Sequence, residues 1–286
     1  MHKSSAKPCS EHFTVKRLFS LDLPILLTVI FILFPLAWAV LTSLKTPDQI
    51  SGINFSFLPN PPTFSNYASA WRQSKFQVYF CNSLIISLSS VVFIVLLSIC
   101  NGYTLSRCDF RGKKAVMVVL LCTQMMPVVL YIVPLFVIFK GMGLINTRTS
   151  VIIFYIVHNI AFDSIMMKSF VDGVPYEIEE AAHVDGCGRV RTIFQIVLPL
   201  LLPGVVACCA MAFVSCWNEF MAAFSFIQNQ SLFTIPVALK YMIGEFDVNY
   251  GALAAGSIIA LLVPVALFAY IQKYLVSGLS SGAVKG

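Results

Sequence analysis

The side chains that could do chemistry are concentrated in one polar stretch, residues 174–186, which reads VPYEIEEAAHVDG. It holds four of the thirteen acidic residues of the chain, Glu177, Glu179, Glu180 and Asp185. Acid–base catalysis would need a positioned partner for these groups, and the four histidines and the remaining acids form no such constellation. No cysteine or histidine spacing is typical of a metal site. The stretch therefore predicts a contact surface for a soluble partner, with no catalytic residues and no metal.

The elements that must position this stretch are strongly apolar. Of 286 residues, 58% are hydrophobic and only 11% are charged, well below the roughly 25% of a soluble domain. We expect an all-α integral membrane protein. The net charge of +6 does not indicate nucleic-acid binding, because the basic residues are scattered singly or in small groups between apolar runs.

Uncharged runs of about 20 residues are long enough to cross the hydrocarbon core of a bilayer. We expect six spans within one transmembrane domain, residues 23–275, at about 23–44, 82–103, 115–139, 149–167, 203–226 and 251–274. Residues 1–22 form a polar N-terminus, and the run after them is long and ends without a cleavage site, so it stays as the first span. Pro127 and Pro134 predict a kinked third span.

The positive-inside rule orients these spans. With both termini in the cytoplasm, thirteen of the nineteen Lys and Arg residues lie on the cytoplasmic side and six lie outside. The polar stretch and the tail at 276–286 are then cytoplasmic.

Residues 174–199 predict two short helices around a turn. Pro175 suits the first helical turn, and Gly186 can take the left-handed conformation that ends a helix. Two apolar stripes follow from the helical spacing, Ile178, Ala181 and Ala182 in the first helix and Val190, Ile193, Phe194 and Val197 in the second. A loop lying on lipid headgroups, with Arg189 and Arg191 facing phosphates, is an alternative interpretation.

Polar residues inside spans are costly and become candidates for a pathway through the membrane. These candidates are His158 and Asn159 in the fourth span and Trp217, Asn218 and Glu219 in the fifth. For Asn218 and Glu219 two roles remain open, contact with a solute or a tie between helices. Asp163 lies toward the inner end of its span, where we expect it to be solvated or paired with Lys168.

The order Glu180-Ala181-Ala182, Asp185-Gly186 and Ile196-x-Leu198-Pro199 resembles the EAA motif of permease subunits in binding-protein-dependent ABC importers. Further matches extend over almost the whole chain: Asn66-Tyr67, Asn82-Ser83, Trp217-Asn218-Glu219-Phe220, Tyr250-Gly251-Ala252-Leu253, Gly278-Leu279 and the terminal Gly282-Ala283-Val284-Lys285-Gly286. Together they are similar to the smaller, six-span, maltose-type permease of the carbohydrate-importing branch.

This resemblance implies a type I importer fold with a coupling helix that begins near Pro175. It implies that Glu180 contacts an ATPase subunit, that Ala181, Ala182, Asp185 and Gly186 belong to the same contact, and that the tail at Lys285 and Gly286 reaches the ATPase. The partners implied are a second permease in a heterodimer, two ATPase subunits and an extracytoplasmic sugar-binding protein. The resemblance also implies that the chain binds no cofactor and is no enzyme, because ATP and Mg would belong to the ATPase. In agreement, it has no GxxxxGK[ST] phosphate loop.

His183 and Cys187 depart from the residues that many relatives carry there. Two alternatives remain, a permease for another small solute such as a polyamine or phosphate, and a proton- or sodium-coupled secondary transporter. The Trp217-Asn218-Glu219-Phe220 motif and the terminal motif favour sugar. We expect a multi-pass protein of a prokaryotic cell membrane.

Overall fold

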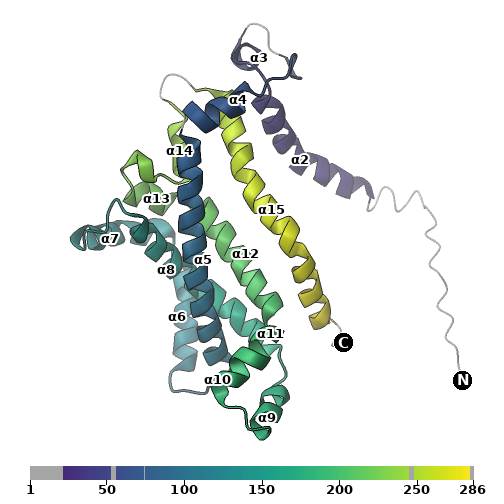
Figure 1. Ribbon diagram of the computed structural model, residues 1–286, viewed down its shortest axis with the longest axis vertical. Helices are drawn as coiled ribbons and strands as arrows, with labels where there is room; N and C mark the ends of the chain where they lie inside the picture. The colour runs from purple at the N-terminus through teal and green to yellow at the C-terminus, as the bar shows by residue number, and fades with distance from the viewer. Residues whose placement is uncertain (1–21, 53–55, 74, 245–247, 284–286) are drawn as a thin grey trace, which may run out of the picture.

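The computed structural model describes residues 22–52, 56–73, 75–244 and 248–283. These residues form an elongated bundle of helices (Figure 1). Helix α9, Glu177–Val184, lies at one end of the bundle, and helix α4, Ser65–Ala68, lies at the other. We call these the α9 end and the α4 end.

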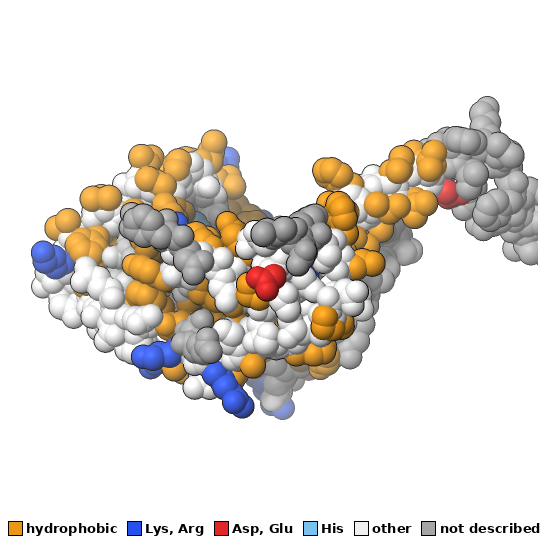
Figure 2. Space-filling view, turned by 90° about the horizontal axis from the view of Figure 1, so that it is seen from above, with side chains coloured by type: hydrophobic (Ala, Val, Ile, Leu, Met, Phe, Trp, Pro, Cys, Tyr) orange, Lys and Arg blue, Asp and Glu red, His pale blue; other side chains and the backbone are white. Residues whose placement is uncertain are grey.

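Helix α2, Leu23–Ser43, is apolar over its whole length, yet Ser43 is its one buried residue. It contacts α15 and extends away from the bundle, and its apolar side chains stand out in Figure 2. A helix of 21 residues with this surface would aggregate in water, whereas it matches the thickness of a bilayer. The exposed apolar surface of α2 therefore fits a membrane span.

Three long helices form the core of the bundle: α5, Phe76–Arg107; α8, Arg148–Asp172; and α12, Leu202–Asn218. Gly102 lets α5 approach α8 closely, since a Cβ atom there would lie 2.8 Å from the backbone nitrogen of Lys168 and 2.7 Å from the side chain of Met167. Gly204 does the same for α12 against Phe170 of α8. Small residues at such crossings allow helices to pack closely inside a membrane, where the hydrophobic effect does not drive helices together.

The third expected span, 115–139, is broken rather than kinked. Helix α6, Lys113–Met125, and helix α7, Val128–Gly141, meet at an angle of 98°. The break lies at Met126 and Pro127, whereas Pro134 lies inside α7 without ending it. Both prolines remove a helix hydrogen bond, so the neighbouring packing decides which one breaks the helix.

The fifth expected span, 203–226, is also interrupted. Helix α12 ends at Asn218, and a short helix α13, Met221–Phe226, follows after two residues. The segment after it contains two short helices that the sequence did not predict, η4, Gln230–Leu232, and α14, Ile235–Tyr241. The last helix, α15, Tyr250–Ala283, continues into the region expected to be a tail.

The all-α fold class is confirmed. Within the described residues four helices are long and apolar enough to cross a membrane, or up to six if each of two bent helix pairs counts as one span. The segment between the first two expected spans holds α3, Pro47–Ser51, as well as α4 and the π-helix η2, Ser69–Gln73.

Two sequence motifs hold the α4 end together. The amide of Asn66 donates to the carbonyl oxygens of Ser43 and Lys45, at 2.9 and 2.7 Å, and Tyr67 Oη bonds Ser43 Oγ at 2.8 Å. A Cβ atom on Gly251 would lie 2.6 Å from Asn66 Oδ1, so only glycine allows the start of α15 to pack there.

Asn82 and Ser83 of α5 form the second join. The Asn82 amide donates to the carbonyl oxygens of Ser231 and Phe233, at 2.9 and 3.1 Å, and its Oδ1 accepts from Arg148 Nη2 at 2.8 Å. Ser83 Oγ accepts from the backbone N–H of Ile235 at 2.8 Å. One helix turn of α5 therefore fixes both the start of α8 and the segment 231–235.

We predict that Gly102→Leu destabilises the bundle by about 1–3 kcal/mol, because the added side chain meets the backbone of α8, which cannot rotate away. Gly141→Leu is the matched control, since a Cβ atom at Gly141 has no neighbour within 4 Å. Thermal unfolding of the purified protein in detergent measures both variants. Equal unfolding temperatures would show that the α5–α8 crossing is not tight.

Candidate functional site

The polar stretch folds as expected at its turn. Helix α9 ends at Val184, and Gly186 has the left-handed conformation with a φ of 82°. The N–H of Gly186 donates to the carbonyl of His183 at 3.1 Å, and the N–H of Cys187 donates to the carbonyl of Ala182 at 2.9 Å. This pair of bonds is the Schellman motif, in which glycine avoids the steric cost of the left-handed conformation. The left-handed conformation predicted for Gly186 is confirmed.

The second half of the stretch contains three short helical pieces. They are α10, Arg189–Thr192; the π-helix η3, Ile193–Val197; and α11, Leu198–Leu200. The expected apolar stripe is divided between two environments, because Val197 is fully buried whereas Val190 and Phe194 are exposed. The exposed pair gives the α9 end an apolar surface.

The residues of the EAA motif are divided in the same way. Glu180, Ala181, Asp185 and Gly186 are exposed, whereas Ala182 packs against the rest of the chain. Ile178 and Val184 are exposed on the same helix. The α9 end therefore presents large apolar side chains beside carboxylates, a combination that fits a protein partner better than anionic lipid headgroups.

Glu179 is buried, although its neighbours Glu177 and Glu180 are exposed. Its Oε1 accepts from Arg107 Nε at 2.6 Å and its Oε2 accepts from Tyr103 Oη at 2.7 Å. Sequence reasoning missed this pair. Nothing in the run of acids distinguishes Glu179, because both of its partners come from the end of α5, more than seventy residues earlier.

Two of the pathway candidates, Asn159 and Glu219, lie between helices. Asn159 Nδ2 donates to the carbonyl of Tyr155 at 2.8 Å and lies 3.8 Å from Cys216 Sγ of α12. Glu219 accepts from the backbone N–H groups of Ala222 and Ala223, at 2.8 and 3.3 Å. The Glu219 carboxylate thus caps helix α13, which begins two residues later.

His158 faces a cavity of about 400 Å³ at the break between α6 and α7. Its Nδ1 lies 2.6 Å from Tyr131 Oη. The rings of Tyr131, Phe154 and His158 stack, with Tyr131 and His158 each 5.8 Å from Phe154 between ring centroids. An aromatic stack with two polar edges can bind the faces and hydroxyl groups of a solute.

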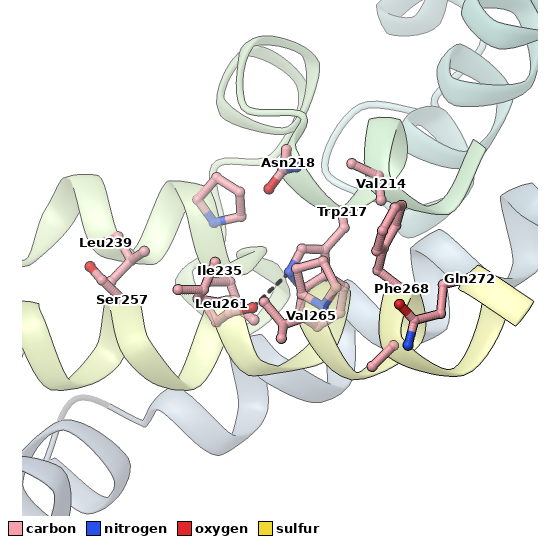
Figure 3. A pocket seen from close by; sticks show the side chains of 14 residues that line it. Val214, Trp217, Asn218, Ile235, Leu239, Ser257, Leu261, Val265, Phe268 and Gln272 are labelled. Atoms are coloured by element: carbon pink, nitrogen blue, oxygen red, sulfur yellow. Dashed lines mark hydrogen bonds between the residues drawn. The ribbon is translucent and has the colours of Figure 1, made fainter. Parts of the chain in front are cut away.

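Trp217 and Asn218 line a second cavity, of about 740 Å³, between α12, α14 and α15 (Figure 3). Trp217 Nε1 donates to the carbonyl of Ala260 at 3.2 Å. Residue 264, four positions after Ala260, is a proline inside α15 and has no N–H to donate to that carbonyl. The indole therefore replaces a missing helix bond, and Asn218 supplies an amide to the cavity wall.

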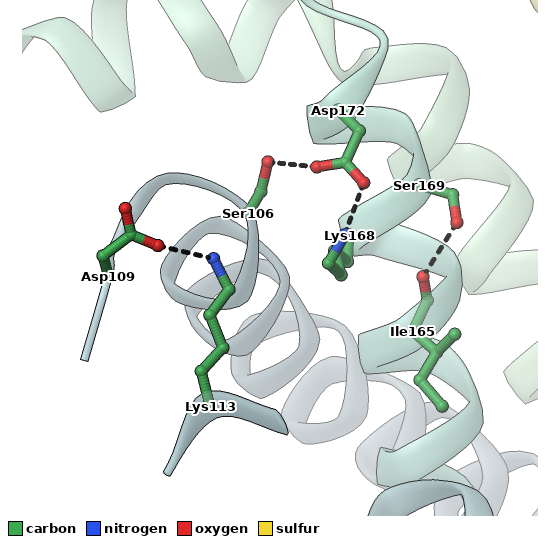
Figure 4. A network of polar contacts seen from close by, with 7 residues as sticks. All are labelled: Ser106, Asp109, Lys113, Ile165, Lys168, Ser169 and Asp172. Carbon is green, nitrogen blue, oxygen red and sulfur yellow. Dashed lines mark hydrogen bonds and ion pairs between the residues drawn. The ribbon is translucent and has the colours of Figure 1, made fainter. Parts of the chain in front are cut away.

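The expectation for Asp163 is wrong. Asp163 is 1% exposed, and neither of its carboxyl oxygens has a hydrogen-bond partner among the described residues. Lys168 pairs instead with Asp172, at 2.5 Å, and Asp172 also accepts from Ser106 Oγ of α5 (Figure 4). Packing of α8 against α12 encloses Asp163, whose carbonyl lies 3.9 Å from Cys208 Sγ.

The predicted site residues that the structure describes thus lie in three kinds of place: on the surface at α9, in the walls of two cavities, and between helices. No group of three or more His, Cys, Asp or Glu suited to a metal occurs in the part of the chain that is described. Lys285 and Gly286 lie outside the described residues.

Comparison with known proteins identifies the family. The sequence model described as "binding-protein-dependent transport system inner membrane component" matches residues 94–281. The chain is 34% identical to the sulfoquinovosyl glycerol transport system permease of Agrobacterium fabrum, with 89% of each chain covered. It is 31% identical to the arabinooligosaccharides transport system permease of Bacillus subtilis, covering 97% of this chain and 99% of that one.

A solved structure shows the same fold. It is that of a bacterial ABC transporter involved in the import of the acidic polysaccharide alginate, with a TM-score of 0.80 and 20% sequence identity. The similarity covers 94% of this chain and 99% of the matched chain. The family resemblance found in the sequence is confirmed.

We predict that Glu219→Ala destabilises the protein by about 1–2 kcal/mol, because the N–H groups of Ala222 and Ala223 lose their acceptor. Glu219→Gln keeps one acceptor oxygen and should lose clearly less. Thermal unfolding in detergent compares the two variants. If both unfold at the wild-type temperature, the cap contributes nothing and Glu219 returns to the pathway candidates.

Proposed function

Because the chain belongs to the family of binding-protein-dependent inner membrane components, whose permease subunits are not themselves enzymes, we propose that it is the permease subunit of an ATP-driven sugar importer. It forms half of the translocation pathway and couples that pathway to an ATPase. One observation carries the proposal: the EAA motif lies on α9, where the structure leaves Glu180, Ala181 and Asp185 exposed beside large apolar side chains.

In this proposal α9 is the coupling helix, and the α9 end faces the cytoplasm. Glu180 contacts the ATPase, and Ala181 and Gly186 allow its surface to come close. Val184 and Phe194, which are 87% and 64% exposed, supply the apolar part of the contact. Ala182 belongs to the sequence motif, but its side chain is buried against the rest of this chain. The proposed contact with the ATPase therefore does not include Ala182.

The partners follow from this role. A second permease completes the pathway, and the exposed surface of α2 is long enough to pack on it or on lipid. Two ATPase subunits bind ATP and Mg, since this chain has no phosphate loop. An extracytoplasmic sugar-binding protein delivers the solute to the α4 end, and the tail at Lys285 and Gly286 contacts the ATPase.

Sugar is the proposed solute class because relatives with 31–34% identity are named for sugar or oligosaccharide transport. The two cavities offer the aromatic and amide groups that bind sugars. His158 with Tyr131 lines one of them and Trp217 with Asn218 lines the other. We assign Asn159 and Glu219 a structural role beside this pathway, because their side chains already form hydrogen bonds to other groups of the protein.

Reconstitution tests the proposal. The complex purified through this chain should contain an ATPase and a second permease, and in proteoliposomes it should take up sugar only when ATP and the binding protein are both present. Uptake driven by a proton or sodium gradient without ATP would contradict it.

We predict that Gly186→Pro leaves the chain inserted but abolishes binding-protein-stimulated ATP hydrolysis and uptake. Proline fixes φ near −65°, whereas residue 186 needs 82°, so the turn after α9 cannot form. Gly186→Asn is the matched control, because asparagine tolerates the left-handed conformation best among the other residues. Normal uptake by a stably expressed Gly186→Pro variant would exclude a coupling role for this turn.

A further inference from the structure

The last turn of α5 carries three polar side chains, Tyr103, Ser106 and Arg107, spaced by three and four residues on one side of the helix. Together they bond two other helices at the α9 end. Tyr103 and Arg107 bond Glu179 of α9, and Ser106 bonds Asp172 of α8 at 2.5 Å. This turn therefore joins α5 to both helices that meet there.

The pair formed by Arg107 and Glu179 is enclosed. The Arg107 side chain is 12% exposed and the Glu179 side chain is 2% exposed. A second nitrogen of the Arg107 guanidinium, Nη2, donates to the carbonyl of Val174 at 2.6 Å. The central carbon of the guanidinium, Cζ, lies 5.6 Å from the ring centroid of Tyr176. Every oxygen of the carboxylate has a donor, and the guanidinium also holds the backbone that leads into α9.

Charges enclosed in this way resist separation. Pulling one partner away leaves the other charge out of water and uncompensated, which is far more costly than breaking an exposed ion pair. By contrast, the chain enters and leaves α9 through turns, one at residues 173–176 and one at Gly186. Within the described residues, this enclosed ion pair is the side-chain contact that we infer holds α9 most firmly to a long helix.

Helix α5 reaches from this joint to the opposite end of the molecule. Its 32 residues correspond to about 48 Å at 1.5 Å per residue. At the α4 end, Asn82 and Ser83 bond the backbone of Ser231, Phe233 and Ile235. A single helix is thus hydrogen-bonded to α9 at one end and to the segment 231–235 at the other.

We propose that the ion pair of Arg107 with Glu179 is the joint through which a displacement of α9 passes into α5 and along it to the segment 231–235. The inference rests on the proposed coupling role of α9. Glu179, Arg107 and Tyr103 are positioning residues in this mechanism: they contact neither the solute nor the nucleotide. Glu180 binds the ATPase on the exposed side of α9, and Glu179 transmits the movement on the buried side.

The test uses the whole complex in proteoliposomes. Glu179→Gln should leave the ATPase bound and its basal hydrolysis within about twofold of wild type, but lower the stimulation by sugar-loaded binding protein and the sugar taken up per ATP roughly tenfold or more. Glu177→Gln, which removes an exposed carboxylate from the same helix, is the matched control and should behave as wild type.

Two further variants keep the test decisive if Glu179→Gln fails to assemble. Tyr103→Phe removes a single hydroxyl donor and should lower the stimulation several-fold with assembly intact. Arg107→Glu combined with Glu179→Arg rebuilds the pair with reversed charges and should recover more stimulation than the product of the two single effects predicts.

Stimulation by the binding protein that stays within about twofold of wild type in assembled Glu179→Gln and Tyr103→Phe complexes would overturn the inference. So would a reversed pair with no recovery beyond the two single variants. Failure of the proposed function looks different, because the wild-type complex itself would then show neither stimulation nor ATP-dependent sugar uptake.

Discussion

Backbone N–H and C=O groups in a membrane find no water, so each must be bonded within the protein. This constraint explains the places where the helices of this chain are interrupted. Where α15 contains Pro264, the indole of Trp217 bonds the carbonyl of Ala260 that lost its helix donor. Where α12 stops, Glu219 bonds two N–H groups at the start of α13.

The same constraint explains most of the polar motifs. Asn66 and Asn82 direct their amides to backbone carbonyls from distant segments, and Ser83 accepts a backbone N–H. These side chains appear in the sequence as isolated polar residues beside apolar runs. In the structure they connect helices. Of the pathway candidates, His158, Trp217 and Asn218 line cavities.

The features that depend on local sequence were predictable. Apolar runs of about 20 residues predicted long apolar helices, and within the described residues four helices are long and apolar enough to cross a membrane. The order of glycine and helix-forming residues predicted the turn at Gly186. The kink expected at Pro127 and Pro134 became a 98° break at the first and an intact helix at the second. That difference depends on which neighbours satisfy the freed groups, and a single span does not contain that information.

The features that depend on distant partners were not predictable. Glu179 is indistinguishable from Glu177 and Glu180 until α5 brings Arg107 and Tyr103 beside it. Asp163 was expected near water and is enclosed instead, because α12 packs over it. Helix α14 was also missed, although Thr234 and Pro236 lie at its start; there the N–H of Ile235 is bonded by Ser83 of α5, a distant partner.

The central claim is that α9 and the end of α5 that contacts it move as one unit when the proposed ATPase partner closes. It is tested most directly by the distance between spin labels at Glu177 of α9 and Thr104 of α5, both exposed, in a complex whose native cysteines have been replaced. Pulsed electron paramagnetic resonance should give one narrow distribution whose centre is the same with and without a bound ATP analogue, and Glu179→Gln should broaden it. A shifted centre on ATP binding with Glu179 intact would contradict the account.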